Sequence, residues 1–150
     1  MISKGVKSIF PIKNQEIWDR YKQHIQAFWT TEEVSLQDDL RDLETLNEGE
    51  KHFIKHVLAY FANSEAMINE NLASRFYKEI LIPEARCFIS MQMLNESIHA
   101  EMYGLQIEAY VEDPSEKDKL FSAIQNVPCI NKKAQWVSKW LNGNQNLLTR

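Results

Sequence analysis

The sequence contains few cysteines, glycines and prolines. Among its 150 residues there are two cysteines, four glycines and four prolines. Cys87 and Cys129 do not form a CxxC pair, and we expect both thiols to stay reduced in a cytosolic setting. Most of the glycines and prolines stand where helices should begin or end, and no low-complexity tract is present.

Long apolar runs and an excess of basic residues are also absent. No stretch approaches the apolar length of a bilayer-spanning helix, and the start, MISKGVKSIFPIKN, lacks the sustained apolar core of a signal peptide. The formal net charge is −4, so no basic surface points to nucleic acid. We therefore predict a soluble cytoplasmic protein without nucleic-acid or membrane partners.

Helical periodicity dominates the rest of the sequence. Hydrophobic residues make up 44% and charged residues 25%, as in an ordinary globular protein. Thr30 or Thr31 can cap a helix within a connector at 29–38, Pro83 suits a first helical turn, and Asp113 can cap a helix that begins at Pro114. The predicted helices span 14–28, 39–46, 47–77, a helix from 83 that continues past 110 to a stop at 112–114, a segment from 114, and 131–141. No strand is predicted, so the fold class is all-α.

Two of these helices, the one at 47–77 and the one that begins at 83, are long and strongly patterned. A four-helix bundle needs two more of that kind. The sequence ends with NQNLLTR soon after the last predicted helix. We therefore expect residues 1–150 to be the N-terminal part of a single bundle domain whose second half lies outside this sequence.

Both long helices have an apolar stripe that is interrupted by groups that are costly to bury. An isolated buried carboxylate either takes up a proton or destabilises the folded state by roughly several kcal/mol. Two carboxylates and a neutral imidazole facing each other are stabilised if a divalent metal lies between them. The stripes contain Leu58, Phe61, Glu65, Ile68 and Leu72 on the first helix, and Ile89, Gln92, Glu96, His99, Tyr103 and Ile107 on the second.

The spacing of Glu96 and His99 matches a Glu-x-x-His pair, which supplies two metal ligands from one helical turn. A single such pair also occurs by chance, but the position of Glu65 on the other stripe favours a metal site. Carboxylate-rich ligation with one imidazole suits iron or manganese better than structural zinc.

Tyr103 and Trp29 each leave two interpretations open. Tyr103, one turn after His99, could be oxidised beside a redox metal, or could be a core tyrosine hydrogen-bonded to a ligand; the pattern favours the second. Trp29 has the pattern of a core anchor.

Several other residues are assigned no chemistry. His52 and His56 have i, i+4 spacing among charged neighbours, which indicates a solvated face. Trp136 and Trp140 are predicted in the core or an interface. Cys87 has nothing to depress its pKa, Glu84 is predicted to be a first-turn acid and Glu101 an exposed charge.

Four stretches in this order resemble the small subunit of class I ribonucleotide reductase, with the eukaryotic and viral branch the most similar. They are FPIKNQEIWDRYKQHIQAFWTTEEVSLQDDL, HFIKHVLAYFANSEAMINENL, EARCFISMQMLNESIHAEMYGLQIEAYV and NVPCINKKAQWVSKW. The resemblance runs from about Phe10 to Leu141 and depends on several motifs rather than on one Glu-x-x-His.

The resemblance implies a ferritin-like helical bundle and a ribonucleoside-diphosphate reductase subunit, located in the host cytoplasm if the chain is viral. It implies a dimetal–carboxylate centre, di-iron first and manganese–iron as the alternative, that generates a tyrosyl radical for the large subunit to use. It also implies that Glu65, Glu96 and His99 are metal ligands, that Tyr103 is the radical residue and that Trp29 relays electrons. Expected partners are the large subunit and either a second copy or a complementing chain.

The sequence departs from the family pattern at two points. Glu65 stands where the family ordinarily has Asp, which leaves the metal pair open. The single Glu-x-x-His leaves three of the usual six protein ligands, and the C-terminal tail that binds the large subunit is absent. The alternative interpretation is therefore a truncated or split, non-catalytic helical module that no longer binds metal.

Overall fold

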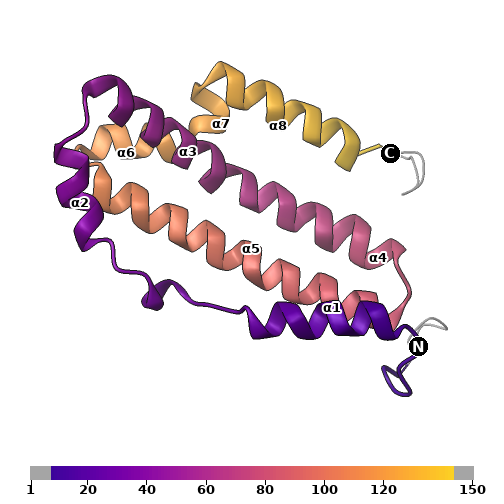
Figure 1. Ribbon diagram of the computed structural model, residues 1–150. Coiled ribbons are helices and arrows are strands. Elements are labelled where there is room, and N and C mark those ends of the chain that lie inside the picture. Colours follow the sequence, from indigo (N-terminus) through magenta and orange to yellow (C-terminus); the bar gives the residue numbers. More distant parts are fainter. Residues whose placement is uncertain (1–7, 144–150) are drawn as a thin grey trace.

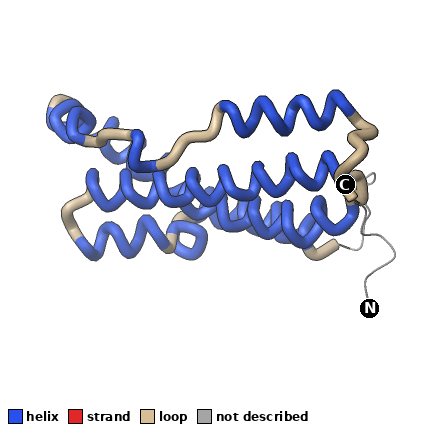
Figure 2. The backbone as a smooth tube through the Cα atoms, turned by 90° about the horizontal axis from the view of Figure 1, so that it is seen from below, coloured by secondary structure: helices blue, strands red, loops and turns tan. Residues whose placement is uncertain are grey.

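The structure, a computed structural model, describes residues 8–143, and every regular element in that range is a helix (Figure 2). The elements in chain order are α1 (Gln15–Gln26), η1 (Thr31–Glu33), α2 (Gln37–Glu44), α3 (Glu48–Asn71), η2 (Leu72–Phe76), α4 (Tyr77–Glu79), α5 (Pro83–Tyr110), α6 (Pro114–Phe121), α7 (Ala123–Asn126) and α8 (Pro128–Leu141). The all-α prediction is confirmed. The NQNLLTR end lies outside the described residues.

The two long helices form the centre of the molecule. Figure 1 shows α3 and α5 side by side and antiparallel, with α1 along the other side of α5 and α8 along the other side of α3. Helices α1 and α5 begin at the same end and run in the same direction (Figure 1). None of the helices in the described range is long and apolar enough to cross a bilayer.

Local sequence signals explain where helices α3, α5 and α6 begin. The Asn47 side chain accepts the amide N–H groups of Gly49 and Glu50, while the Glu50 carboxylate accepts the N–H of Asn47, a reciprocal cap that starts α3. Pro83 and Pro114 open α5 and α6, as predicted.

Several helix boundaries differ from the prediction, and two helices end earlier than predicted: α1 at Gln26 rather than at Phe28, and α5 at Tyr110 rather than at the stop near 112. The helix from 47 continues beyond Tyr77 to Glu79, but through the π-helical turn η2. Helix α8 begins at Pro128, three residues before the predicted start, because proline is tolerated at a first helical position. Helix α2 begins at Gln37 rather than at Asp39, and the short α7 was not predicted.

The main buried core joins α3 and α5 to the three C-terminal helices. Ala59 and Ile107 are fully buried, and Tyr103 packs against this core from one side. Burying apolar surface stabilises this end of the α3–α5 pair by about 25 cal/mol per Å² removed from water. The cluster consists of Leu58, Ala59, Ile107, Val111, Leu120, Ala123 and Ile130.

Glu84 fixes the start of α1 against the start of α5. It is a first-turn acid, as predicted, but it is only 1% exposed. Its Oε1 accepts the backbone N–H of Lys13 at 2.6 Å and of Asn14 at 3.1 Å, and its Oε2 accepts the Asn14 side-chain amide at 3.3 Å. These bonds, the Lys13 amide first, lower the pKa of Glu84 to about 2. The carboxylate therefore stays ionised and stabilises both helix N-termini.

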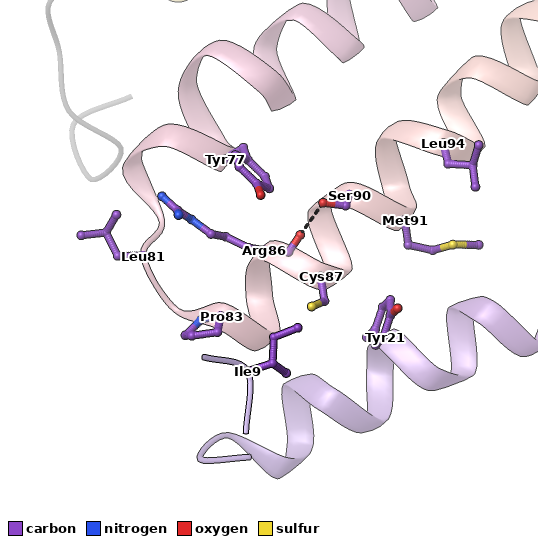
Figure 3. Close-up of a pocket in the computed structure, with 10 residues that line it drawn as sticks. All are labelled: Ile9, Tyr21, Tyr77, Leu81, Pro83, Arg86, Cys87, Ser90, Met91 and Leu94. Atoms are coloured by element: carbon purple, nitrogen blue, oxygen red, sulfur yellow. Dashed lines mark hydrogen bonds between the residues drawn. The ribbon is translucent and has the colours of Figure 1, made fainter. Parts of the chain in front are cut away.

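A pocket of about 450 Å³ lies between the N-terminal segment, α1 and α5 (Figure 3). Cys87 lines it together with Ile9, Tyr21 and Met91. Burial, and then the charge of Glu84, raises the pKa of the Cys87 thiol. A raised pKa agrees with the absence of assigned thiol chemistry.

Candidate metal centre

Glu65 on α3 faces Glu96 and His99 on α5. One ligand atom from each of the three side chains can be chosen so that all lie within 4.8 Å of one another. Across residues 8–143, this is the one group of three or more carboxylate, imidazole or thiolate donors with such geometry. The antiparallel packing of α3 on α5 brings together donors that are 31 to 34 positions apart in the sequence.

Glu65 is the most buried of the three donors, with 4% of its surface exposed. Its Oε2 atom is buried and has no hydrogen-bond partner among the described residues. Burial first, and then the neighbouring Glu96, raises the pKa of Glu65 to about 7. A buried carboxylate oxygen without a hydrogen-bond partner is costly unless a proton or a cation satisfies it.

Glu96 and His99 form a pair on one turn of α5. His99 Nδ1 lies 3.1 Å from Glu96 Oε2, and the Gln92 side-chain amide donates to Glu96 Oε1 at 3.3 Å. The Glu96 side chain is 14% exposed and the His99 side chain 37%. Glu96 is thus held in place by its own helix, toward Glu65.

Tyr103 lies one turn beyond His99 and packs against Phe61 of α3. The two rings are stacked, with centroids 5.1 Å apart and an interplanar angle of 18°. Burial first, and then the charges of Glu65 and Glu96, raises the pKa of the Tyr103 phenol. The phenol is therefore protonated over the physiological pH range.

Trp29 stands in the connector between α1 and η1 and reaches the same group of residues. Its ring stacks on the His99 ring, with centroids 6.0 Å apart and an interplanar angle of 30°. The pattern-based interpretation of Trp29 as a core anchor gave no reason to expect this contact, because it joins positions 70 residues apart.

The donor set fits a metal ion of the kind predicted. Two carboxylates and one imidazole are oxygen-rich donors with one nitrogen, which suit iron or manganese. The partnerless Glu65 Oε2 is an acceptor that a cation would satisfy. Three side chains can occupy only part of the coordination shell of two ions.

Comparison with known proteins places this sequence in a family. Residues 6–150 match the family described as "Ribonucleotide reductase, small chain". The protein belongs to the ribonucleotide reductase small-chain family.

Ribonucleotide reductase small chains of viruses and plants are about half identical to this sequence. The small chain of Swinepox virus (strain Kasza) is 52% identical over 137 residues, which is 91% of this chain and 50% of that protein. The small chain of Nicotiana tabacum is 48% identical over 142 residues, 95% of this chain and 43% of that protein. The sequence thus spans about half the length of the curated relatives it matches.

The fold agrees with this family. The structure of the ribonucleotide reductase Rnr4 homodimer from Saccharomyces cerevisiae superposes with a TM-score of 0.80 at 31% identity, over 93% of this chain and 44% of that chain. The ferritin-like helical class is therefore confirmed. The family uses a dimetal centre, and the group formed by Glu65, Glu96 and His99 is where this family member could bind metal.

The other histidines and tryptophans discussed in the sequence analysis lie away from the candidate metal centre. His52 and His56 are on the second and third turns of α3, and His52 is exposed, as predicted. Trp136 is 64% exposed and contacts Trp140 edge to face, so a core position for Trp136 is wrong. Its side chain projects from α8 because the core face of that helix is occupied by Ile130 and Ala134.

Proposed function

We propose that this protein acts in the small subunit of a ribonucleoside-diphosphate reductase. In this proposal Glu65, Glu96 and His99 bind one side of a dimetal–carboxylate centre within a single ferritin-like domain. The observation that supports it most directly is that Glu65 faces the other two donors and that its buried Oε2 has no hydrogen-bond partner in the described residues. Family membership supports the same chemistry.

The donor chemistry favours a di-iron centre, with a manganese–iron pair as the alternative. When bound, such a centre would use O₂ to oxidise a nearby side chain by one electron. Glu65 supplies negative charge from a position largely closed to water. The Gln92 side-chain amide orients Glu96 by donating a hydrogen bond to Glu96 Oε1. The extra methylene of Glu65, relative to the aspartate usual in the family, changes its reach and therefore bears on which metals bind.

Tyr103 is the side chain proposed to hold the radical. It lies one turn from His99, and its phenol is kept protonated by burial and by the two carboxylates. Phe61 covers one face of the ring and limits contact with water there. Oxidation of this phenol would pass one electron and one proton to the oxygen that is reduced at the centre, and would leave a neutral tyrosyl radical.

Trp29 is proposed to relay electrons between the centre and the large subunit. The support is its stacking on His99, which places an oxidisable indole ring against a proposed ligand. Trp29 also belongs to the connector that leads through η1 to α2. Helix α2 lies at the edge of the molecule (Figure 1).

The proposed partners are the large subunit and a second source of metal ligands, either another copy of this chain or a complementing chain. Three donors are too few for two ions, so further donors must come from outside the described residues. The alternative of a non-catalytic module receives no support from the site, because both carboxylates and the imidazole still face each other.

The first prediction tests Glu65 as a ligand. The protein would be combined with the part of the Swinepox virus relative that it does not match, and loaded with iron and manganese together. We expect two ions per complex in the wild type and the loss of at least one in Glu65→Ala, because a ligand is removed. Elemental analysis after desalting gives the stoichiometry.

Two further variants sharpen this test. Glu101→Ala removes an exposed carboxylate from α5 and should leave the stoichiometry unchanged. Glu65→Asp should keep two ions but change the ratio of iron to manganese, because its shorter arm alters reach and denticity. Full metal content and unchanged metal preference in Glu65→Ala would show that Glu65 is not a ligand.

A further inference from the structure

Two of the four histidines form a separate pair on α3. His52 and His56 lie on successive turns of one helix face, and their ring centroids are only 4.0 Å apart with an interplanar angle of 34°. His52 is exposed and His56 is half-buried. The other two histidines are differently engaged: His24 Nε2 lies 3.0 Å from the Asn95 side-chain amide, and His99 belongs to the candidate metal centre.

The hydrogen bond of His56 determines which of its nitrogens is free. His56 Nδ1 lies 2.8 Å from the backbone carbonyl oxygen of His52. A carbonyl oxygen only accepts, so Nδ1 must be the protonated donor. In the neutral ring the lone pair is then on Nε2. Metal-binding histidines commonly show this arrangement, with one ring N–H donated to a backbone carbonyl and the other nitrogen left for the ion.

The charged neighbours do not disfavour a cation at this position. The sequence pattern indicated a solvated face, in part because Lys51 and Lys55 flank the histidines. In the structure the Lys51 amine lies 3.5 Å from the Glu48 carboxylate, and the Lys55 amine lies 2.9 Å from Glu116 of α6. Each lysine charge next to the pair is therefore balanced by a carboxylate.

We propose that His52 and His56 bind one Cu²⁺, Ni²⁺ or Zn²⁺ ion. Two imidazole nitrogens at about 2.0 Å from one ion lie about 3 Å apart. The 4.0 Å separation of the ring centroids and the exposed position of His52 allow that approach by a small side-chain rotation. Imidazole donors rank Cu²⁺ above Ni²⁺ and Zn²⁺, and all three above Mn²⁺. No third donor of the described range joins this pair, so water completes the coordination shell.

The test uses all 150 residues with His99→Ala, which removes the imidazole of the candidate centre and keeps the two sites distinct. Isothermal titration with Zn²⁺ in chelator-free buffer should give one ion per chain. His52→Ala and His56→Ala should each weaken binding by at least about tenfold, because a chelate becomes a single ligand. Cu²⁺ bound to the same protein should show two equivalent imidazole nitrogens in its electron paramagnetic resonance spectrum.

A matched control keeps the composition and changes only the geometry. Lys51→His combined with His52→Lys moves one imidazole about 100° around the helix, so it no longer shares a face with His56. Circular dichroism would establish that each variant remains helical, as expected for changes outside the core. Loss of binding in the exchanged variant supports the site. Zn²⁺ affinity unchanged in that variant, or in either alanine variant, overturns the proposal.

Discussion

At the scale of single residues, Tyr103 combines a shielded ring with a position one turn from His99. Its pKa is raised by burial and by two carboxylates, and Phe61 stacks on it. In the complex used for metal loading, Tyr103→Phe should retain the ions, because only a hydroxyl is removed, and should alter the free energy of unfolding by no more than about 1 kcal/mol. The organic radical signal in electron paramagnetic resonance should disappear. Tyr60→Phe, a change on α3 beside Phe61, is the control and should keep the signal. A signal that persists in Tyr103→Phe would contradict this assignment.

Trp29, unlike Tyr103, has its ring stacked on a proposed metal ligand, His99. Trp29→Phe keeps an aromatic ring beside His99 but replaces the indole with a ring that is far harder to oxidise. We expect normal metal content and a normal radical signal, with turnover abolished when the large subunit is added. Trp136→Phe, a change at an exposed ring, is the control and should turn over normally. Near-normal turnover in Trp29→Phe would remove this residue from the mechanism.

At the scale of the elements, one carboxylate serves two helices. Glu84 lies in the first turn of α5 and accepts hydrogen bonds from the residues that precede α1. The Asn14 side chain makes no cap hydrogen bond to its own helix, and its amide donates to Glu84. The attachment of the start of α1 to the start of α5 therefore depends on the ionised form of Glu84. The later part of α1 is attached to α5 by His24, through Phe88 and Asn95.

This dependence gives a stability prediction with a pH signature. The pKa of Glu84 is about 2 in the folded state, below its ordinary value of 4.5. Its contribution is therefore complete above about pH 4.5 and is lost as the pH falls toward 2. Glu84→Gln should lower the melting temperature by several degrees at pH 7, and the difference from wild type should shrink below pH 4.5. Thermal melts followed by circular dichroism test this, with Glu101→Gln as the exposed control. A difference that stays constant with pH would show that charge is not the cause.

Local signals sufficed to predict α3, α5 and α6. Pro83, and Asp113 before Pro114, act on their own helices, so their effect can be predicted from neighbouring residues, and the apolar periodicity of 47–77 predicted α3. The π-helical turn η2 could not be predicted, because its sequence, LASRF, has no feature that distinguishes it from a continuing α-helix.

The candidate site likewise combines features that the local sequence predicts with features that it does not. The stripe through Glu96, His99 and Tyr103 follows from helical spacing, and the position of Glu65 at the centre of the other stripe was enough to bring the two helices together in the prediction. The buried state of Glu84 and the stacking of Trp29 on His99 depend on partners about 70 residues away. Such contacts arise only when the helices pack, so the local sequence contains no signal for them.

At the scale of the whole molecule, apolar surface remains exposed next to the candidate centre. Phe61 and Ile68, which flank Glu65 along α3, are each 38% exposed. An apolar cavity of about 770 Å³ extends from Ile68 and Gln92 across the molecule to Trp136 and Trp140 of α8. Contiguous apolar surface of this kind favours association with another helical surface.

The last prediction follows from this surface and from the number of donors. The 150-residue chain alone should bind fewer than two ions tightly, because Glu65, Glu96 and His99 are too few to complete two coordination shells. It should also self-associate through the exposed apolar surface. Adding the unmatched part of the Swinepox virus relative should raise the metal content to two ions per complex and suppress self-association. Elemental analysis after desalting and analytical ultracentrifugation measure the two effects. Two tightly bound iron or manganese ions in a strictly monomeric His52→Ala variant, which lacks the proposed His52–His56 site, would contradict the prediction and would mean that donors outside residues 8–143 of the same chain complete the site.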